Sequence, residues 1–154
     1  MESNFEKEWI NFLSDFCIKY KDRSTISRHA TMIFIDENPD IKWDWHYVSK
    51  NENISIEYIK ENIQKNWDWR GICMHNNLTM EIINNNPDLP WLWKEISSNK
   101  NISIKMIHDN IEKPWDWISI TKRLFHENIE NYPYLPWEFY YISEYEHLTE
   151  KIIK

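Results

Sequence analysis

Trp43-Asp44-Trp45 is the stretch that decides the fold, because it returns along the chain at a nearly constant spacing. The leading aromatic residues of the first four copies lie 24 residues apart, and the last step is 22 residues. The further copies are Trp67-Asp68-Trp69, Trp91-Leu92-Trp93, Trp115-Asp116-Trp117 and the softened Trp137-Glu138-Phe139. A period of this length is typical of a repeat protein whose units stack on one another.

Two short helices fit within each repeat. Helix A is predicted to begin around the first Trp, since a proline precedes it in three repeats and an acidic residue follows it in most of them. Helix B is predicted to begin after N-capping hydroxyl residues, namely Ser55, Thr79, Ser103 and Thr149. Helix A is expected to end near Asn51, His75 or Asn99, and an asparagine can adopt the left-handed conformation of a C-terminal cap. The Asn-Pro-Asp segments at 38–40 and 86–88 are interpreted as turns between units.

Helices of about nine residues are marginal in water, because isolated helices shorter than roughly 12–15 residues rarely persist. Stacking of neighbouring repeats must therefore stabilise them. The sequence predicts an all-α fold, an α-solenoid of about five 22–24-residue helix-pair repeats with an N-terminal capping helix. One domain is expected over 1–154, with the capping helix at 1–23, a degenerate unit at 24–37 and the tryptophan repeats at 38–154. A docking helix for a partner is the alternative interpretation of the N-terminal segment.

The two aromatic residues of each motif are expected to point in opposite directions, because residues two apart on a helix are separated by about 200°. The second aromatic shares its side with an aliphatic residue three positions later and is predicted to be core. The first is predicted to wedge against the preceding unit, and the alternative is that it lines an exposed groove. Burial of so large a ring would strongly stabilise each repeat.

Charge and composition exclude several classes of function. The formal net charge of −7 repels a phosphate backbone, so nucleic acid is a poor partner. Two isolated cysteines indicate reduced thiols, and we expect a soluble protein with no signal peptide and no membrane-spanning segment. The six histidines show no zinc-binding spacing, and a single glycine, Gly71, cannot form a phosphate-binding loop. The sequence therefore predicts no enzyme, no cofactor and no metal site.

Positions that differ between repeats are where a particular ligand would be recognised, because the shared positions hold the stack. On helix A we predict a partner-binding face that is most apolar toward the carboxy-terminal repeats, where tyrosines suit a binding hot spot. Its candidate residues are Tyr47, Arg70, Met74, Ile118, Tyr140 and Tyr141. The open alternative is that these side chains are merely solvated or cap the end of the array.

The unit Asn-Pro-Asp-x-x-Trp-Asp-Trp-x-x-(Ile/Val)-Ser-x-Asn, found at 38–51 and in variants after Asn86 and Asn110, resembles the tryptophan-repeat proteins of large cytoplasmic DNA viruses, such as entomopoxviruses and giant viruses of amoebae. The likeness covers residues 36–154. It implies a viral, non-enzymatic protein of the host-cell cytoplasm, with no catalytic residues to carry over. We therefore expect a protein-interaction scaffold acting on a host or viral protein; the alternative is a self-associating structural component of a virion or viral assembly site.

Overall fold

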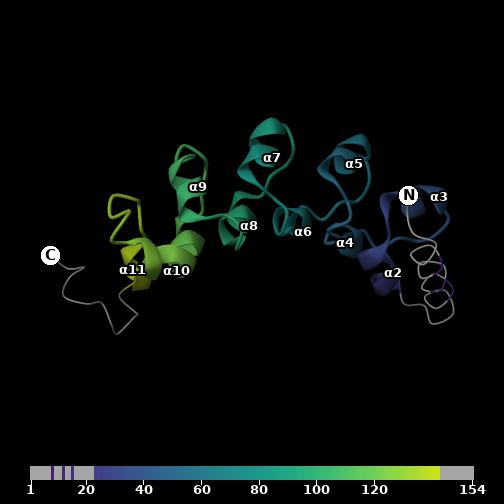
Figure 1. The fold of residues 1–154 in the computed structure, drawn as a ribbon, viewed down its shortest axis with the longest axis horizontal. Coiled ribbons are helices and arrows are strands. Elements are labelled where there is room, and N and C mark those ends of the chain that lie inside the picture. The colour runs from purple at the N-terminus through teal and green to yellow at the C-terminus, as the bar shows by residue number, and fades with distance from the viewer. Residues whose placement is uncertain (1–7, 9–11, 13–14, 16–22, 143–154) are drawn as a thin grey trace. The chain divides into compact units, whose positions relative to one another are not determined.

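The computed structural model describes residues 8, 12, 15 and 23–142, and the regular structure within these residues is helical throughout (Figure 1). The predicted all-α fold is confirmed. The chain divides into two compact units, Met1–Asn77 and Leu78–Lys154. The predicted capping helix at 1–23 lies outside the described residues except for a few positions, of which Glu8, Phe12 and Asp15 are helical. The helix B predicted after Thr149 also lies outside them.

Unit 1 places its A and B helices on opposite sides (Figure 1). Its A helices are α2 (Arg23–His29), α4 (Trp45–Val48) and α6 (Trp69–Cys73), and its B helices are α3 (Met32–Glu37) and α5 (Ile56–Glu61). Each repeat therefore contributes one helix to each side of the unit, as the helix-pair pattern predicts.

Unit 2 follows the same pattern with one exception. Its B helices are α7 (Met80–Asn85) and α9 (Ile104–His108), and its A helices are α8 (Trp93–Ser98), α10 (Trp117–Asn128) and α11 (Phe139–Ile142). Helix α10 runs through the positions of both helices of its repeat, because residues 121–128 lack the asparagine-rich turn that separates A from B elsewhere. This is the repeat that is 22 residues long, and the two-helix prediction is wrong there.

Helix A begins at the second aromatic residue of the motif, so the prediction that it begins around the first Trp is wrong. In α4, α6 and α10 the aspartate between the rings is the N-cap, and its carboxylate accepts a backbone N–H of the first turn. Asp44 accepts from His46 at 3.2 Å and Asp68 accepts from Arg70 at 3.1 Å. The first Trp therefore precedes the helix. The angle of about 200° expected between the two aromatic side chains does not apply, because it holds only when both residues are helical.

The predicted N-caps of helix B are confirmed, since the hydroxyls of Ser55, Thr79 and Ser103 each accept a backbone N–H three residues later. The left-handed cap predicted for the end of helix A is wrong at Asn99, whose φ is −68°. Its side-chain oxygen instead accepts the N–H of Asn101 at 2.9 Å. Polar side chains thus supply the caps that a chain with one glycine cannot obtain from backbone conformation.

The first Trp of every motif is held by the same hydrogen bond. Its indole N–H donates to the backbone carbonyl five residues earlier, at distances of 2.8–3.1 Å. The pairs are Trp43 with Asn38, Trp67 with Asn62, Trp91 with Asn86, Trp115 with Asn110 and Trp137 with Tyr132. This bond closes a short loop between helix B and the next helix A, and it fixes the ring before helix A begins.

Within each unit the first Trp packs edge-on against the second aromatic of the preceding repeat. Trp67 lies 4.9 Å from Trp45, and Trp115 lies 5.0 Å from Trp93, measured between ring centroids. Trp67 and Trp115 are buried, so the predicted wedge is confirmed at these positions. The prediction that the second aromatics are core is wrong: the described tryptophans at this position are half-buried, and Phe139 is 64% exposed. They lie at the helix N-terminus, where the aliphatic residues of the following turn take the interior.

A ladder of hydroxyl groups joins consecutive repeats within each unit. A buried Ser or Thr near the end or middle of helix A accepts the backbone N–H of the acidic cap in the next repeat, at 2.7–3.0 Å. The pairs in this hydroxyl ladder are Ser27 with Asp44, Ser49 with Asp68, Ser97 with Asp116 and Thr121 with Glu138. The Ser or Thr found at this position in most repeats therefore has a structural role. Its hydroxyl accepts a backbone N–H that would otherwise be left without a partner.

The carbonyl groups of the ladder serines are also satisfied by the following repeat. Asn51 donates to Ser27, His75 Nε2 donates to Ser49 at 2.7 Å, and Arg123 donates to Ser97. A carbonyl can only accept, so the Nε2 of His75 carries the hydrogen. These polar side chains lie between repeats, where a sequence pattern of apolar residues gives no indication of them.

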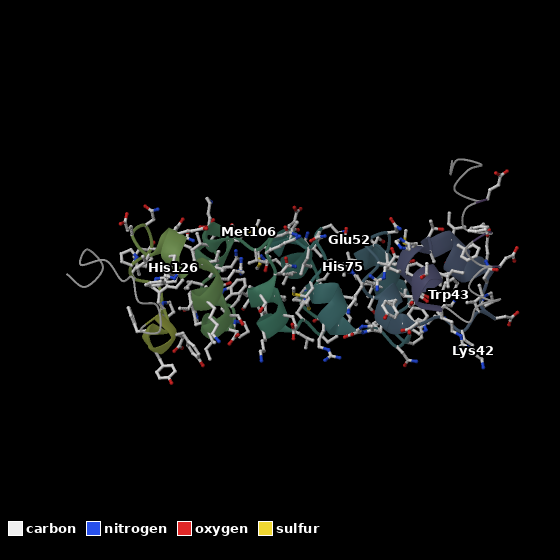
Figure 2. The ribbon with its side chains drawn as sticks, turned by 90° about the horizontal axis from the view of Figure 1, so that it is seen from below. Lys42, Trp43, Glu52, His75, Met106 and His126 are labelled. Carbon is white, nitrogen blue, oxygen red and sulfur yellow. The ribbon has the colours of Figure 1, made fainter. Side chains whose placement is uncertain are left out.

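Replacing His75 with Asn, the residue found at the equivalent positions 51 and 99, is expected to remove a pH dependence of folding. Burial lowers the pKa of His75 from its ordinary value of 6.5, against the opposing effects of the Ser49 carbonyl and the nearby Glu52 (Figure 2). Because the unfolded chain binds this proton at higher pH, the stability is fully present above about pH 6.5 and falls as the pH decreases below it.

Urea unfolding of the wild type and the His75→Asn variant at about pH 7, 6 and 5.5 measures this effect, since these values bracket the ordinary histidine pKa. The wild type should lose stability across the series, and the variant should lose less. Equal slopes for the two proteins would show that His75 is not the titrating group.

Candidate functional site

The predicted partner face falls partly on unit 1, where its residues lie on helix A or its C-terminal cap. Tyr47 is half-buried, and the Arg28 guanidinium lies 4.8 Å above its ring. Arg70 is exposed and pairs with the Asp68 cap at 3.4 Å. Met74 is exposed at the C-cap of α6. Each of these side chains is accessible in part, but Tyr47 and Arg70 are already engaged with neighbours.

In unit 2 the structure brings the predicted tyrosines together with a lysine. The rings of Tyr140 and Tyr141 lie 5.3 Å apart, and the Lys122 ammonium lies 4.3 Å above Tyr141. Ile118 is exposed one helical turn before Lys122, on the same side of α10. Tyr140 is 74% exposed. We call the group Ile118, Lys122, Phe139, Tyr140 and Tyr141 the aromatic patch; Lys122 and Phe139 were not among the predicted residues.

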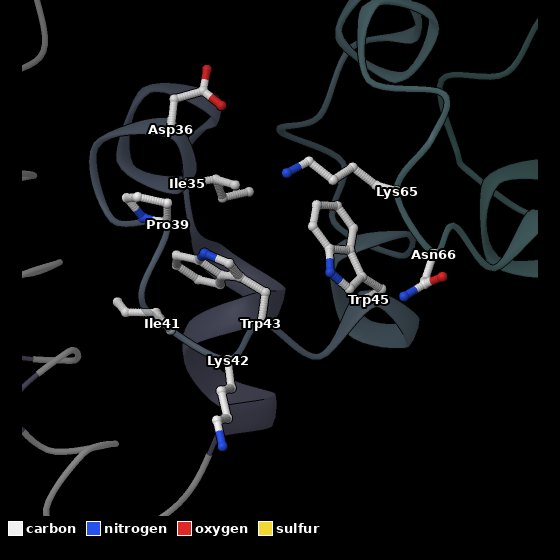
Figure 3. A pocket seen from close by; sticks show the side chains of 9 residues that line it. All are labelled: Ile35, Asp36, Pro39, Ile41, Lys42, Trp43, Trp45, Lys65 and Asn66. Carbon is white, nitrogen blue, oxygen red and sulfur yellow. The ribbon is translucent and has the colours of Figure 1, made fainter.

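A pocket of about 430 Å³ lies in unit 1 beside the first tryptophan motif (Figure 3). The Trp43 and Trp45 rings stand side by side in it, and the Lys65 side chain reaches over Trp45, with its ammonium 5.6 Å from the ring centroid. Aliphatic residues close the opposite side. The full lining is Ile35, Asp36, Pro39, Ile41, Lys42, Trp43, Trp45, Lys65 and Asn66.

Unit 2 has a second pocket, of about 230 Å³, built from the corresponding residues. Every residue that lines it lies 48 positions after a residue that lines the first. The lining is Ile83, Asn84, Pro87, Leu89, Pro90, Trp91, Trp93 and Lys113. We call the two sites the twin pockets. Their recurrence in both compact units indicates that the pocket is a property of the repeat sequence and not of one local irregularity.

The signal that would have found the twin pockets is an alternation between repeats. Asn-Pro-Asp precedes Trp43 and Trp91, whereas the corresponding segments before Trp67 and Trp115 have no proline after the asparagine. Two residues before the Trp, these segments have Lys65 or Lys113, and the other repeats have an aliphatic residue. The period of the pocket is therefore two repeats. The groove considered as an alternative for the first Trp exists at Trp43 and Trp91, which are half-buried, whereas Trp67 and Trp115 are buried.

The polar groups of the twin pockets differ in how far they are already engaged. Asp36 accepts the Tyr58 hydroxyl at 2.7 Å, and burial together with this bond raises the pKa of Tyr58, so the phenol remains a donor. Asn84 is similarly engaged, since it donates to Asn110 at 3.2 Å. In contrast, the Trp45 and Trp93 indole N–H groups make no hydrogen bond to any residue that the structure describes. A ligand in either pocket would meet an indole donor and a lysine.

Within residues 8, 12, 15 and 23–142, no group of three or more His, Cys, Asp or Glu side chains is arranged to hold a metal ion. None of the helices described here has the length and apolar character needed to cross a membrane. No protein-family model, curated protein or solved structure matches the chain.

Proposed function

We propose that the protein is a non-enzymatic scaffold that binds a protein partner through the aromatic patch of unit 2. The observation that carries this proposal is the exposure of Phe139 and Tyr140 beside the Lys122–Tyr141 pair. Large rings left in water are costly, whereas tyrosine at an interface contributes much area with little loss of conformational entropy. Repeats stacked within each unit support an α-solenoid as the scaffold, and such folds commonly present extended binding surfaces.

The resemblance to viral tryptophan-repeat proteins supports a partner in the cytoplasm of an infected cell. Under this proposal the partner is a host or viral protein. The motif residues hold the repeats together, and the patch differs from the corresponding positions of the other repeats, so that it can be selective.

The test compares capture of partners by the wild type with capture by a Tyr140→Ala, Tyr141→Ala double variant. Loss of two hot-spot tyrosines should weaken a specific interaction by roughly tenfold or more. Tyr134→Ala is the matched control, because Tyr134 is 67% exposed but lies outside the patch. Partners that the double variant retains, or that the control loses equally, would contradict the proposal. Light scattering at rising concentration identifies the case in which the partner is a second copy of the chain.

A further inference from the structure

We infer that the twin pockets are two equivalent binding sites for an extended, proline-containing peptide that carries a carboxylate. This inference goes beyond the proposed function, because it concerns residues that the aromatic patch does not include. It rests on three properties that the pockets share: two indole rings in the lining, an indole donor with no hydrogen bond to a residue that the structure describes, and a lysine in the lining.

The paired rings suit proline. Trp43 and Trp45 line the same pocket, and Pro39 and Ile41 lie beside Trp43 on the side away from Trp45 (Figure 3). Aromatic-lined grooves bind proline-rich segments because the polyproline II helix is already extended and loses little entropy on binding. The compact, rigid pyrrolidine ring loses less conformational entropy between such surfaces than a flexible aliphatic chain does.

The indole donor suits the backbone of the same ligand. The Trp45 nitrogen lies on the side of its ring that faces Trp43 (Figure 3), and Trp93 occupies the equivalent position in unit 2. A polyproline II segment has solvated carbonyl groups without internal hydrogen bonds, and these can accept an indole N–H. The neighbouring Trp43 and Trp91 cannot serve, because their N–H groups already donate to Asn38 and Asn86.

The charge of the pockets selects an acidic ligand. Asp36, Lys42 and Lys65 line the first pocket, and Lys113 is the charged residue that lines the second. Two lysines and one aspartate leave the first pocket with an excess of one positive charge, and Lys113 leaves the second with the same excess, in a chain of net charge −7. Lys113 lies 3.7 Å from the exposed Glu112, a weak surface pair that a bound carboxylate could replace. An acidic residue beside proline therefore complements both pockets, whereas a basic one does not.

The experiment is a calorimetric titration of the full chain with an acetylated and amidated heptapeptide in which a central glutamate is flanked by proline pairs. Two peptides should bind each chain. Lys65→Glu and Lys113→Glu should each weaken one site by on the order of tenfold and leave the other unchanged, and the double variant should lose both. Each pocket is thus the control for the other. A single site outside these residues, or binding that neither lysine variant alters, would overturn the inference.

Three further measurements separate this site from alternatives. Peptides with lysine in place of glutamate, or alanine in place of proline, should bind at least about tenfold more weakly; equal binding would overturn the inference. The indole N–H signals of Trp45 and Trp93 should shift in nuclear magnetic resonance spectra with peptide, and Trp45→Phe, which keeps a ring but removes the donor, should weaken that pocket. The Tyr140→Ala, Tyr141→Ala variant should bind the heptapeptide normally, so that failure of the patch and failure of the pockets are distinguishable.

Discussion

Replacing Trp67 with alanine is expected to lower the free energy of unfolding by about 3–5 kcal/mol. Trp67 is only 8% exposed, contacts Trp45 of the preceding repeat at 4.9 Å and Tyr58 at 6.3 Å, and donates its N–H to Asn62. Alanine leaves a cavity where the repeats meet and removes both ring contacts. Urea unfolding followed by circular dichroism measures the loss, which is a large part of a typical net stability of about 5–15 kcal/mol.

The Trp67→Phe variant distinguishes the contribution of the aromatic ring to stability from the contribution of the indole hydrogen bond. Phenylalanine keeps most of the apolar surface but cannot donate to the Asn62 carbonyl, so its cost should be nearer about 1–2 kcal/mol. An alanine variant as stable as the wild type would show that the ring does not hold the repeats of unit 1 together. Equal losses for Ala and Phe would instead assign the stabilisation to the hydrogen bond.

Replacing Asn51 with alanine is expected to cost about 3 kcal/mol. Asn51 is 2% exposed; its amide donates to Ala30 at 2.7 Å and to Ser27 at 3.3 Å, and its oxygen accepts the Asn53 N–H at 3.0 Å. Removing the side chain leaves these buried backbone groups unsatisfied between repeats. The midpoint of urea unfolding is again the measurement, with an unchanged slope as evidence that the unfolding reaction is the same.

Asn53→Ala is the matched control for this prediction. Asn53 is exposed, and alanine preserves the backbone N–H that Asn51 accepts, so the expected change is within about 0.5 kcal/mol. A loss at position 53 as large as that at position 51 would point to the turn itself and not to the bonds between repeats.

The repeat, the helix pair and the N-caps of helix B were predictable because each has a local sequence signal. Hydroxyl residues before an apolar period place the start of α5, α7 and α9 correctly. The start of helix A was placed too early because an acidic residue suits both the first turn and the N-cap, and only the structure shows the carboxylate of Asp44 accepting the His46 N–H. That error of two residues changed the direction assigned to every tryptophan.

The twin pockets and the hydroxyl ladder could not be predicted from one repeat, because both combine residues of two. Lys65 contributes to the pocket of the preceding motif, and Ser49 serves the backbone of the following one. Tyr140 and Tyr141, in contrast, were predicted as candidates because a difference between repeats is visible in the sequence. Their role in binding is still a prediction, and their proximity to Lys122 is a result of the structure.

The hydroxyl ladder gives each unit a polarity. In each of its bonds a hydroxyl oxygen of the earlier repeat accepts a backbone N–H of the later repeat. Ser27 accepts from Asp44, and Ser97 accepts from Asp116. Within this ladder the two sides of a repeat are therefore chemically unlike: one presents hydroxyl acceptors and the other presents backbone N–H donors. It follows that engineered arrays can be lengthened by whole repeats only in the native order, and that reversing a single module would set acceptor against acceptor.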